Sequence, residues 1–240
     1  MAQRPLRPLR CICDVSRVFL LSPANCSGTR AKQILSPNAQ FELACALRSR
    51  RGAMLGDVFA FISGLYFRGK LTYAMRFAAP PEPGNAIVGC GVHVITPTAG
   101  LRSPDLYVTQ KAVRAFAGGD VHPDNAGYRR PLEASAQALL GELDDACEIV
   151  LLGSVASPKY VDVLTSIFGE RLTFPIDFVG RGDMSRGGLL LRHARDGVEL
   201  PYAPVVGATL HGQRPPKLPP LDYARGKPLD YARGKPLWRA

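Results

Sequence analysis

Short apolar runs and amphipathic stretches alternate along most of the chain. Five runs have the length and composition of buried strands, at residues 18–22, 58–63, 93–96, 148–153 and 172–178. Apolar residues recur at helical spacing in three stretches, at residues 37–50, 131–146 and 160–168. Apolar strands that alternate with amphipathic helices are typical of a parallel sheet. The pattern therefore predicts an α/β fold, a single domain whose central, mainly parallel sheet is flanked by helices.

The two ends of the chain depart from this pattern. We expect a basic N-terminal arm at 1–14, a folded domain at 15–212, and a proline-rich tail at 213–240. The tail carries the octapeptide LDYARGKP twice in succession, at 221–228 and 229–236. Two copies of eight residues are too few for a solenoid, and the proline content favours an extended, weakly ordered segment.

The ends also carry most of the net charge of +10. Residues 11–213 hold twenty basic and eighteen acidic residues, so the expected domain is close to neutral. Basic arms contact phosphates without sequence preference, which indicates a nucleic-acid partner. Solvated tails with no partner are the alternative explanation.

Composition bounds the remaining possibilities. No run approaches eighteen consecutive apolar residues, and the basic start is followed by only a short apolar segment, so we expect no membrane span, no signal peptide, and a cytoplasmic location. The six cysteines and four histidines are scattered without the paired spacing of a metal site. We expect neither a metal nor a cofactor.

Polar, glycine-containing segments follow each predicted strand. Ligands of parallel α/β sheets bind at the carboxyl ends of the strands, so these segments are the expected site. The segments are SPANCSGTRA at 22–31, SGLYFRGKLTYA at 63–74, TPTAGL at 96–101, GSVASPKY at 153–160 and VGRGDMSRGG at 179–188.

Common catalytic motifs are absent from these segments. The sequence contains no GxxxxGK[ST] phosphate loop, no GxGxxG joining a strand to a helix, and no GxSxG nucleophile turn. The remaining Asn, Ser, Tyr, Lys and Arg side chains suit a polar, anionic ligand. A nucleotide, a base within a nucleic acid and a sugar phosphate all fit that description.

The order of the segments from about residue 15 to 195 resembles the uracil-DNA glycosylase superfamily. VFLLSPANCSG is similar to that family's first strand and water-positioning loop, and HVITPTAGL to its base-reading strand. DVHPDNAGYRRPLEASAQALL resembles a His-containing segment that leads into a helix, and EIVLLGSVASPKY the next strand and turn. FPIDFVGRGDMSRGG takes the place of the DNA-intercalating loop.

The resemblance implies hydrolysis of the N-glycosidic bond of a base that is flipped out of DNA. Asn25 would position the water, and Asp183 would act as a base or stabilise the sugar cation. The residues placed near the base are Ser22, Ser27, Ser63, Tyr66, Phe67, Thr96, Ser154 and Tyr160. The residues assigned to DNA phosphates are Arg30, Arg68, Lys159, Arg181 and Arg186, with Met184 as a wedge in the gap left by the base.

Only Asn25 matches the family's water-activating loop, and the family's closing His-Pro-Ser-Pro pattern is absent. These departures favour a modified or bulky base over plain uracil, as in members that attack modified bacteriophage DNA, and hence a role in anti-phage defence. Two alternatives stay open. One is a non-catalytic nucleic-acid-binding module that relies on its basic arms, and the other is an enzyme acting on free nucleotides or sugar phosphates.

Overall fold

The computed structural model describes residues 15–82, 84–156, 158–209, 212–216 and 218. The arm at 1–14 and the repeat-containing part of the tail lie outside the described residues. At the centre is a six-stranded sheet of order β4-β3-β1-β6-β7-β8. Its parallel strands are β1 (Arg17–Leu21), β3 (Val92–Thr96), β6 (Glu148–Leu152) and β7 (Leu172–Pro175). Its antiparallel edges are β4 (Gly100–Arg102) and β8 (Tyr202–Pro204).

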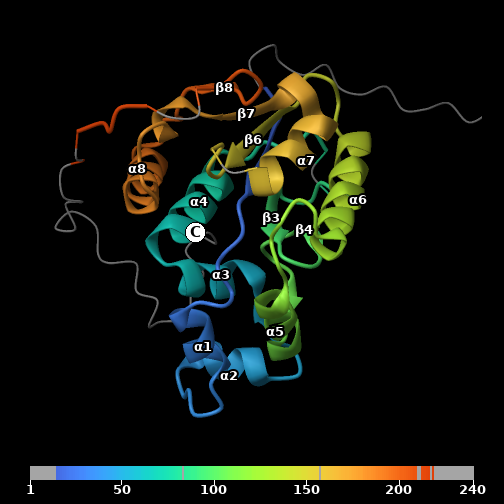
Figure 1. Cartoon of the computed structure of the whole chain (residues 1–240), viewed down its shortest axis with the longest axis vertical. Helices are drawn as coiled ribbons and strands as arrows, with labels where there is room; N and C mark the ends of the chain where they lie inside the picture. Colours follow the sequence, from blue (N-terminus) through green and yellow to red (C-terminus); the bar gives the residue numbers. More distant parts are fainter. Residues whose placement is uncertain (1–14, 83, 157, 210–211, 217, 219–240) are drawn as a thin grey trace, which may run out of the picture.

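Helices cover both faces of this sheet (Figure 1). The helices are α1 (Thr29–Leu35), α2 (Glu42–Arg48), α3 (Leu55–Ser63), α4 (Leu65–Phe77), α5 (Gln110–Gly118), α6 (Ala126–Glu142), α7 (Pro158–Phe168) and α8 (Asp183–Asp196). Side chains alternate along β1, so that Phe19 and Leu21 join the apolar cluster of α3, α4 and α8. Val18 and Leu20 join the opposite cluster, under α6 and α7. The predicted α/β fold with a mainly parallel sheet is thus confirmed.

One predicted strand is wrong. Residues 58–63 belong to α3, and the segment 63–74, predicted to be a loop at a strand end, contains most of α4. Apolar runs of six residues do not distinguish a buried strand from a buried helix, which explains the error. Gly64 separates the two helices at φ +65°, in the region that favours glycine.

The stretch VGRGDMSRGG is likewise only partly a loop. Gly182 is the N-cap of α8, and the helix runs from Asp183, so Gly187 and Gly188 lie inside it. The sequence pattern places these two glycines in a loop at a strand end. They are instead buried helical residues, and Gly187 serves the packing of α8 on α4.

A helical lobe lies beyond the carboxyl ends of β1 and β3, at the bottom of Figure 1. It comprises α1, α2, α3 and α5 with a small antiparallel pair, β2 (Ala53–Met54) and β5 (Tyr107–Val108). We refer to residues 28–63 and 107–118 as the helical lobe. No helix among the described residues is long and apolar enough to span a membrane.

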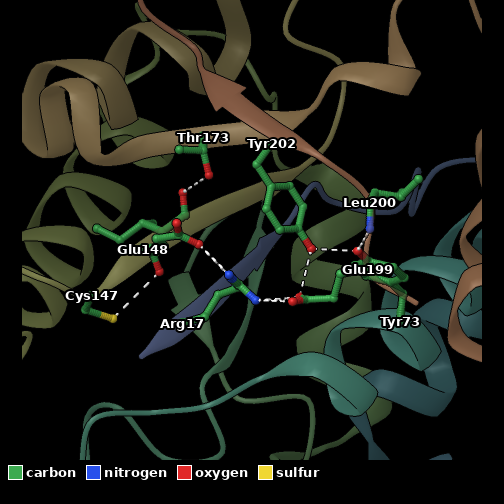
Figure 2. A network of polar contacts seen from close by, with 9 residues as sticks. Arg17, Tyr73, Cys147, Glu148, Thr173, Glu199, Leu200 and Tyr202 are labelled. Carbon is green, nitrogen blue, oxygen red and sulfur yellow. Dashed lines mark hydrogen bonds and ion pairs between the residues drawn. The ribbon is translucent and has the colours of Figure 1, made fainter. Parts of the chain in front are cut away.

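A polar network fixes the opposite, amino-terminal edge of the sheet (Figure 2). Arg17 at the start of β1 donates from Nε to Glu148 of β6 at 2.8 Å and pairs with Glu199. The Tyr73 hydroxyl of α4 lies 2.6 Å from that of Tyr202. The network therefore ties α4 to both halves of the sheet and fixes the helix that carries the candidate site.

Candidate functional site

The candidate site lies where β1 and β6 end. Ser22 follows β1 directly, and Gly153 and Ser154 follow β6. Side chains from α4, α7 and the first turn of α8 meet there. We call Ser22, Tyr66, Lys70, Tyr160, Asp183 and Arg186 the polar edge cluster.

Lys70 is the central member of the polar edge cluster. Its side chain is buried, with the residue 1 % exposed, and its Nζ donates to the backbone oxygen of Ser22 at 2.7 Å and to Ser22 Oγ at 2.8 Å. The ammonium also lies 4.6 Å and 4.9 Å from the ring centres of Tyr66 and Phe67. Among the described residues, no carboxylate forms an ion pair with Lys70.

Burial lowers the pKa of Lys70 from 10.5 to about 7. Asp183 opposes the shift, and the positive charge of Arg186 reinforces it. A lysine with this pKa changes its charge near neutral pH, which is common among lysines at functional sites. Burying its ammonium destabilises the folded chain, so a purely structural role does not explain it.

Two glycines bring α8 onto α4. A Cβ added to Gly69 would lie 2.6 Å from the carbonyl oxygen of Gly187, and one added to Gly187 would lie 2.8 Å from that of Leu65. The two helix backbones therefore touch, which only glycine permits. This contact places Asp183 and Arg186, in the first turn of α8, beside Tyr66 and Lys70.

Arg186 is held by the backbone and not by a strong ion pair. Its Nε and Nη2 donate to the carbonyl oxygen of Phe178 at 3.2 Å and 3.1 Å, and its guanidinium lies 5.4 Å from the ring centre of Phe178. The Asp183 carboxylate is 3.8 Å from Nη1 and is 71 % exposed. Asp183 is therefore an accessible acidic group beside two less exposed cations, Lys70 and Arg186.

Tyr66 contributes a hydroxyl without a hydrogen-bond partner in the described part of the chain. The residue is only 7 % exposed, and burial raises the pKa of the phenol, so the hydroxyl stays protonated and can donate. Buried polar groups are nearly always hydrogen-bonded, so the Tyr66 hydroxyl retains an unused capacity to donate. With Lys70 and Arg186, Tyr66 forms a set of three donors.

Tyr160 closes the cluster on the β6 side. Its hydroxyl accepts from Ser154 N at 2.8 Å and donates to Ser154 O at 3.1 Å. A Cβ at Gly153 would lie 2.7 Å from that hydroxyl and 3.0 Å from Cβ of Ser22. The glycine thus lets Tyr160 approach the end of β1.

The structure brings six of the predicted site residues together and keeps others apart. Those that meet at the strand ends are Ser22, Tyr66, Ser154, Tyr160, Asp183 and Arg186. Asn25 and Ser27 lie outside the cluster, because Asn25 Oδ1 accepts from both the backbone and the hydroxyl of Ser27, at 3.1 Å and 2.8 Å, in the turn before α1. Asn25 keeps an exposed side chain there, with its carbonyl oxygen engaged locally.

Three residues predicted to line the site are placed in the scaffold. Phe67 is fully buried, and the centre of its ring lies 5.5 Å from that of Phe59, so the ring is not exposed for a base to stack on it. Thr96 Oγ1 donates to Gly100 O at 2.8 Å inside the β3–β4 turn. Ser63 is the last residue of α3, and its assignment to a strand end is wrong.

Of the other residues predicted to contact DNA, two flank Asp183 in the chain and three lie on other helices. Met184 is 67 % exposed beside Asp183, and Arg181 hydrogen-bonds to Asp177 O and Ser185 Oγ. The remaining three lie on different helices: Arg30 on α1, Arg68 on α4 and Lys159 on α7.

Sequence reasoning missed Lys70, the residue at the centre of the cluster. Tyr66 and Lys70 are four residues apart, and that spacing places them on one helix face. The signal was lost because the segment was assigned to a loop. In the part of the chain that the structure describes, no group of three His, Cys, Asp or Glu residues is arranged to hold a metal ion.

Comparisons with known proteins identify no relative. No family model matches the chain. No curated protein and no solved structure matches it significantly either.

Proposed function

We propose that the chain is a DNA glycosylase that hydrolyses the N-glycosidic bond of a flipped, modified base at the polar edge cluster. The observation that carries the proposal is the convergence of three donors, on Lys70, Tyr66 and Arg186, with the accessible carboxylate of Asp183 at the carboxyl ends of β1 and β6. This edge is where α/β sheets bind ligands.

The cluster carries charges of the sign that this reaction needs. Cleavage leaves positive charge on the sugar and negative charge on the departing base. Asp183 would stabilise the sugar cation and orient the water whose oxygen bonds to C1′. As the C1′–N bond breaks, Lys70 would transfer a proton to the base and Tyr66 would donate a hydrogen bond to it, while Asp183 takes the proton that the attacking water loses.

The surroundings of Asp183 suit a bound duplex. Met184 follows it in the chain and is exposed, as a side chain that fills the gap of a flipped base must be. Arg181 precedes Asp183 by two residues in the chain and is half-buried, and its guanidinium would bind a phosphate beside the site.

An enzyme that acts on free nucleotides or sugar phosphates is a second candidate. The burial of Lys70 and Tyr66 favours it, since deeply buried donors suit a small ligand that can be enclosed. In that case phosphate, and not a base, would bind Lys70 and Arg186.

Incubation with labelled duplexes that carry modified or unmodified bases, followed by alkaline cleavage of abasic sites, tests the proposal. We expect abasic product from at least one modified duplex. Asp183→Asn should lower its rate about 100-fold or more. Asp177→Asn is the matched control, since Asp177 is another exposed carboxylate nearby, and it should retain activity. Absence of abasic product from every duplex, with turnover of free nucleotides, would replace the glycosylase by the second candidate.

A further inference from the structure

The near-neutral body of the protein has an uneven charge distribution. The helical lobe, residues 28–63 and 107–118, holds seven Lys or Arg and only two acidic residues. The other described residues hold fourteen basic and fifteen acidic side chains. The folded part of the chain thus has one positively charged end, independent of the basic termini.

Four of the lobe's basic side chains are together called the basic lobe surface here: Arg48, Arg51, Lys111 and Arg114. Arg48 and Arg114 donate to the neighbouring carbonyl oxygens of Ser36 and Leu35, at 3.3 Å and 3.4 Å, so their guanidinium groups lie close together. Lys111 lies one turn before Arg114 on α5 and is exposed.

Arg51 extends this surface through an aromatic residue. Its Nη2 donates to the Tyr107 hydroxyl at 2.9 Å, and its guanidinium lies 4.4 Å from the centre of the Tyr107 ring. Tyr107 lies four residues before Lys111 and is 38 % exposed. The surface therefore combines cations with an accessible ring.

No carboxylate neutralises these cations. Among the described residues, none of the four forms an ion pair. Like charges held this close repel one another, and a polyanion that bridges them relieves the repulsion while releasing its own counterions.

The position of the lobe connects it to the polar edge cluster. Residues 22–28 lead from the end of β1 into α1, and α3 leads through Gly64 into α4, which carries Tyr66 and Lys70. Within the lobe, Arg30 at the start of α1 donates to Phe61 O of α3 at 3.1 Å, which ties together the two helices that lead to the cluster. Figure 1 shows the lobe beyond the carboxyl edge of the sheet.

We propose that the basic lobe surface binds the phosphate backbone of the DNA that the polar edge cluster acts on. The inference rests on the proposed function for the choice of DNA. Three of the four cations are arginines, whose planar guanidinium groups suit phosphates and stack on bases. A membrane surface fits less well, because Tyr107 is the only exposed large apolar side chain in the lobe, all of which is described.

Binding of the full-length protein to an unmodified labelled duplex, followed by fluorescence anisotropy over a salt series, tests this surface without turnover. Lys111→Ala/Arg114→Ala should weaken binding about tenfold and lower the salt slope by about two. Arg129→Ala/Arg130→Ala removes two exposed basic residues from the first turns of α6, outside the lobe, and should change the affinity less than twofold. The charge-preserving Lys111→Arg/Arg114→Lys variant should bind like the wild type, which separates charge from folding.

Equal affinities of the two alanine variants would overturn the proposal. So would loss of binding to phosphatidylserine vesicles, but not to duplex, in Lys111→Ala/Arg114→Ala, which would assign the surface to membranes. The glycosylase proposal fails separately, because a protein that binds DNA through the lobe yet forms no abasic site retains this surface and loses the proposed reaction.

Discussion

At the scale of single residues, Lys70 is the least economical choice for a purely structural position. Its ammonium is buried against Ser22 and two aromatic rings, and it forms no ion pair with a carboxylate among the described residues. A methionine of similar length would fill the same space without desolvating a charge. A ligand that carries negative charge would offset the free energy lost when the ammonium is desolvated.

This cost predicts how stability depends on pH. The pKa of Lys70 is about 7 in the folded chain and 10.5 when unperturbed, so between these values the unfolded chain binds the extra proton. The contribution of Lys70 to stability should therefore rise as pH rises from about 7 to 10 and level off below about 7, where both states hold the proton. In Lys70→Met the rise should be largely lost, and the variant should be more stable than wild type at pH 6.

Urea unfolding midpoints at several pH values measure this effect. Burial raises the pKa of Cys26, Cys90 and Cys147, so their thiols act in the opposite direction within the same pH window. Lys70→Met keeps these cysteines, so the difference in stability between wild type and this variant isolates Lys70. A difference that stays flat between pH 7 and 10 would mean that the Lys70 ammonium is not desolvated.

At the scale of elements, the contact between α4 and α8 builds the site. Asp183 and Arg186 reach Tyr66 and Lys70 only because Gly69 and Gly187 let the two helices touch. An apolar core alone does not fix this distance, since larger side chains would hold the helix axes further apart.

Gly187→Ala tests that contact. The added Cβ would lie 2.8 Å from Leu65 O, so we expect a loss of about 1–3 kcal/mol in the free energy of unfolding, together with lower activity as Asp183 and Arg186 move away. Gly141→Ala in α6 is the control, because a Cβ there meets no atom within 4 Å. It should stabilise the protein by about 0.5–1 kcal/mol in chemical denaturation, through its higher helix propensity. If both variants were equally stable, the close contact would not be the reason for glycine at 187.

The sequence predicts elements well where burial is unambiguous. The parallel strands β1, β3 and β6 are apolar and short, and their assignment is confirmed. Residues 58–63 are equally apolar, but their partners lie on helices distant in the sequence, so local pattern alone cannot assign them. Assigning this region to a strand and a loop also left Lys70 out of the predicted site. Lys70 contacts Ser22, which lies 48 positions away in the sequence, so local pattern does not reveal the contact.

At the scale of the whole molecule, positive charge is present both on the basic lobe surface and at the chain ends. Averaging over the chain conceals the first, because the rest of the described fold is close to neutral and dilutes the positive charge of the lobe. Two separate cationic regions imply two additive contributions to the affinity for a polyanion, provided that they contact different phosphates.

Deletion of residues 219–240 separates these contributions. The segment contains five Lys or Arg and two Asp, so its removal should weaken duplex binding and lower the salt slope. Lys111→Ala/Arg114→Ala should then cost the shortened chain the same factor in affinity as it costs the full chain, which anisotropy titrations at matched salt would measure. If the double substitution had no effect on the shortened chain, the lobe would act only by supporting the tail. The folded surface would then lose its independent role in binding DNA.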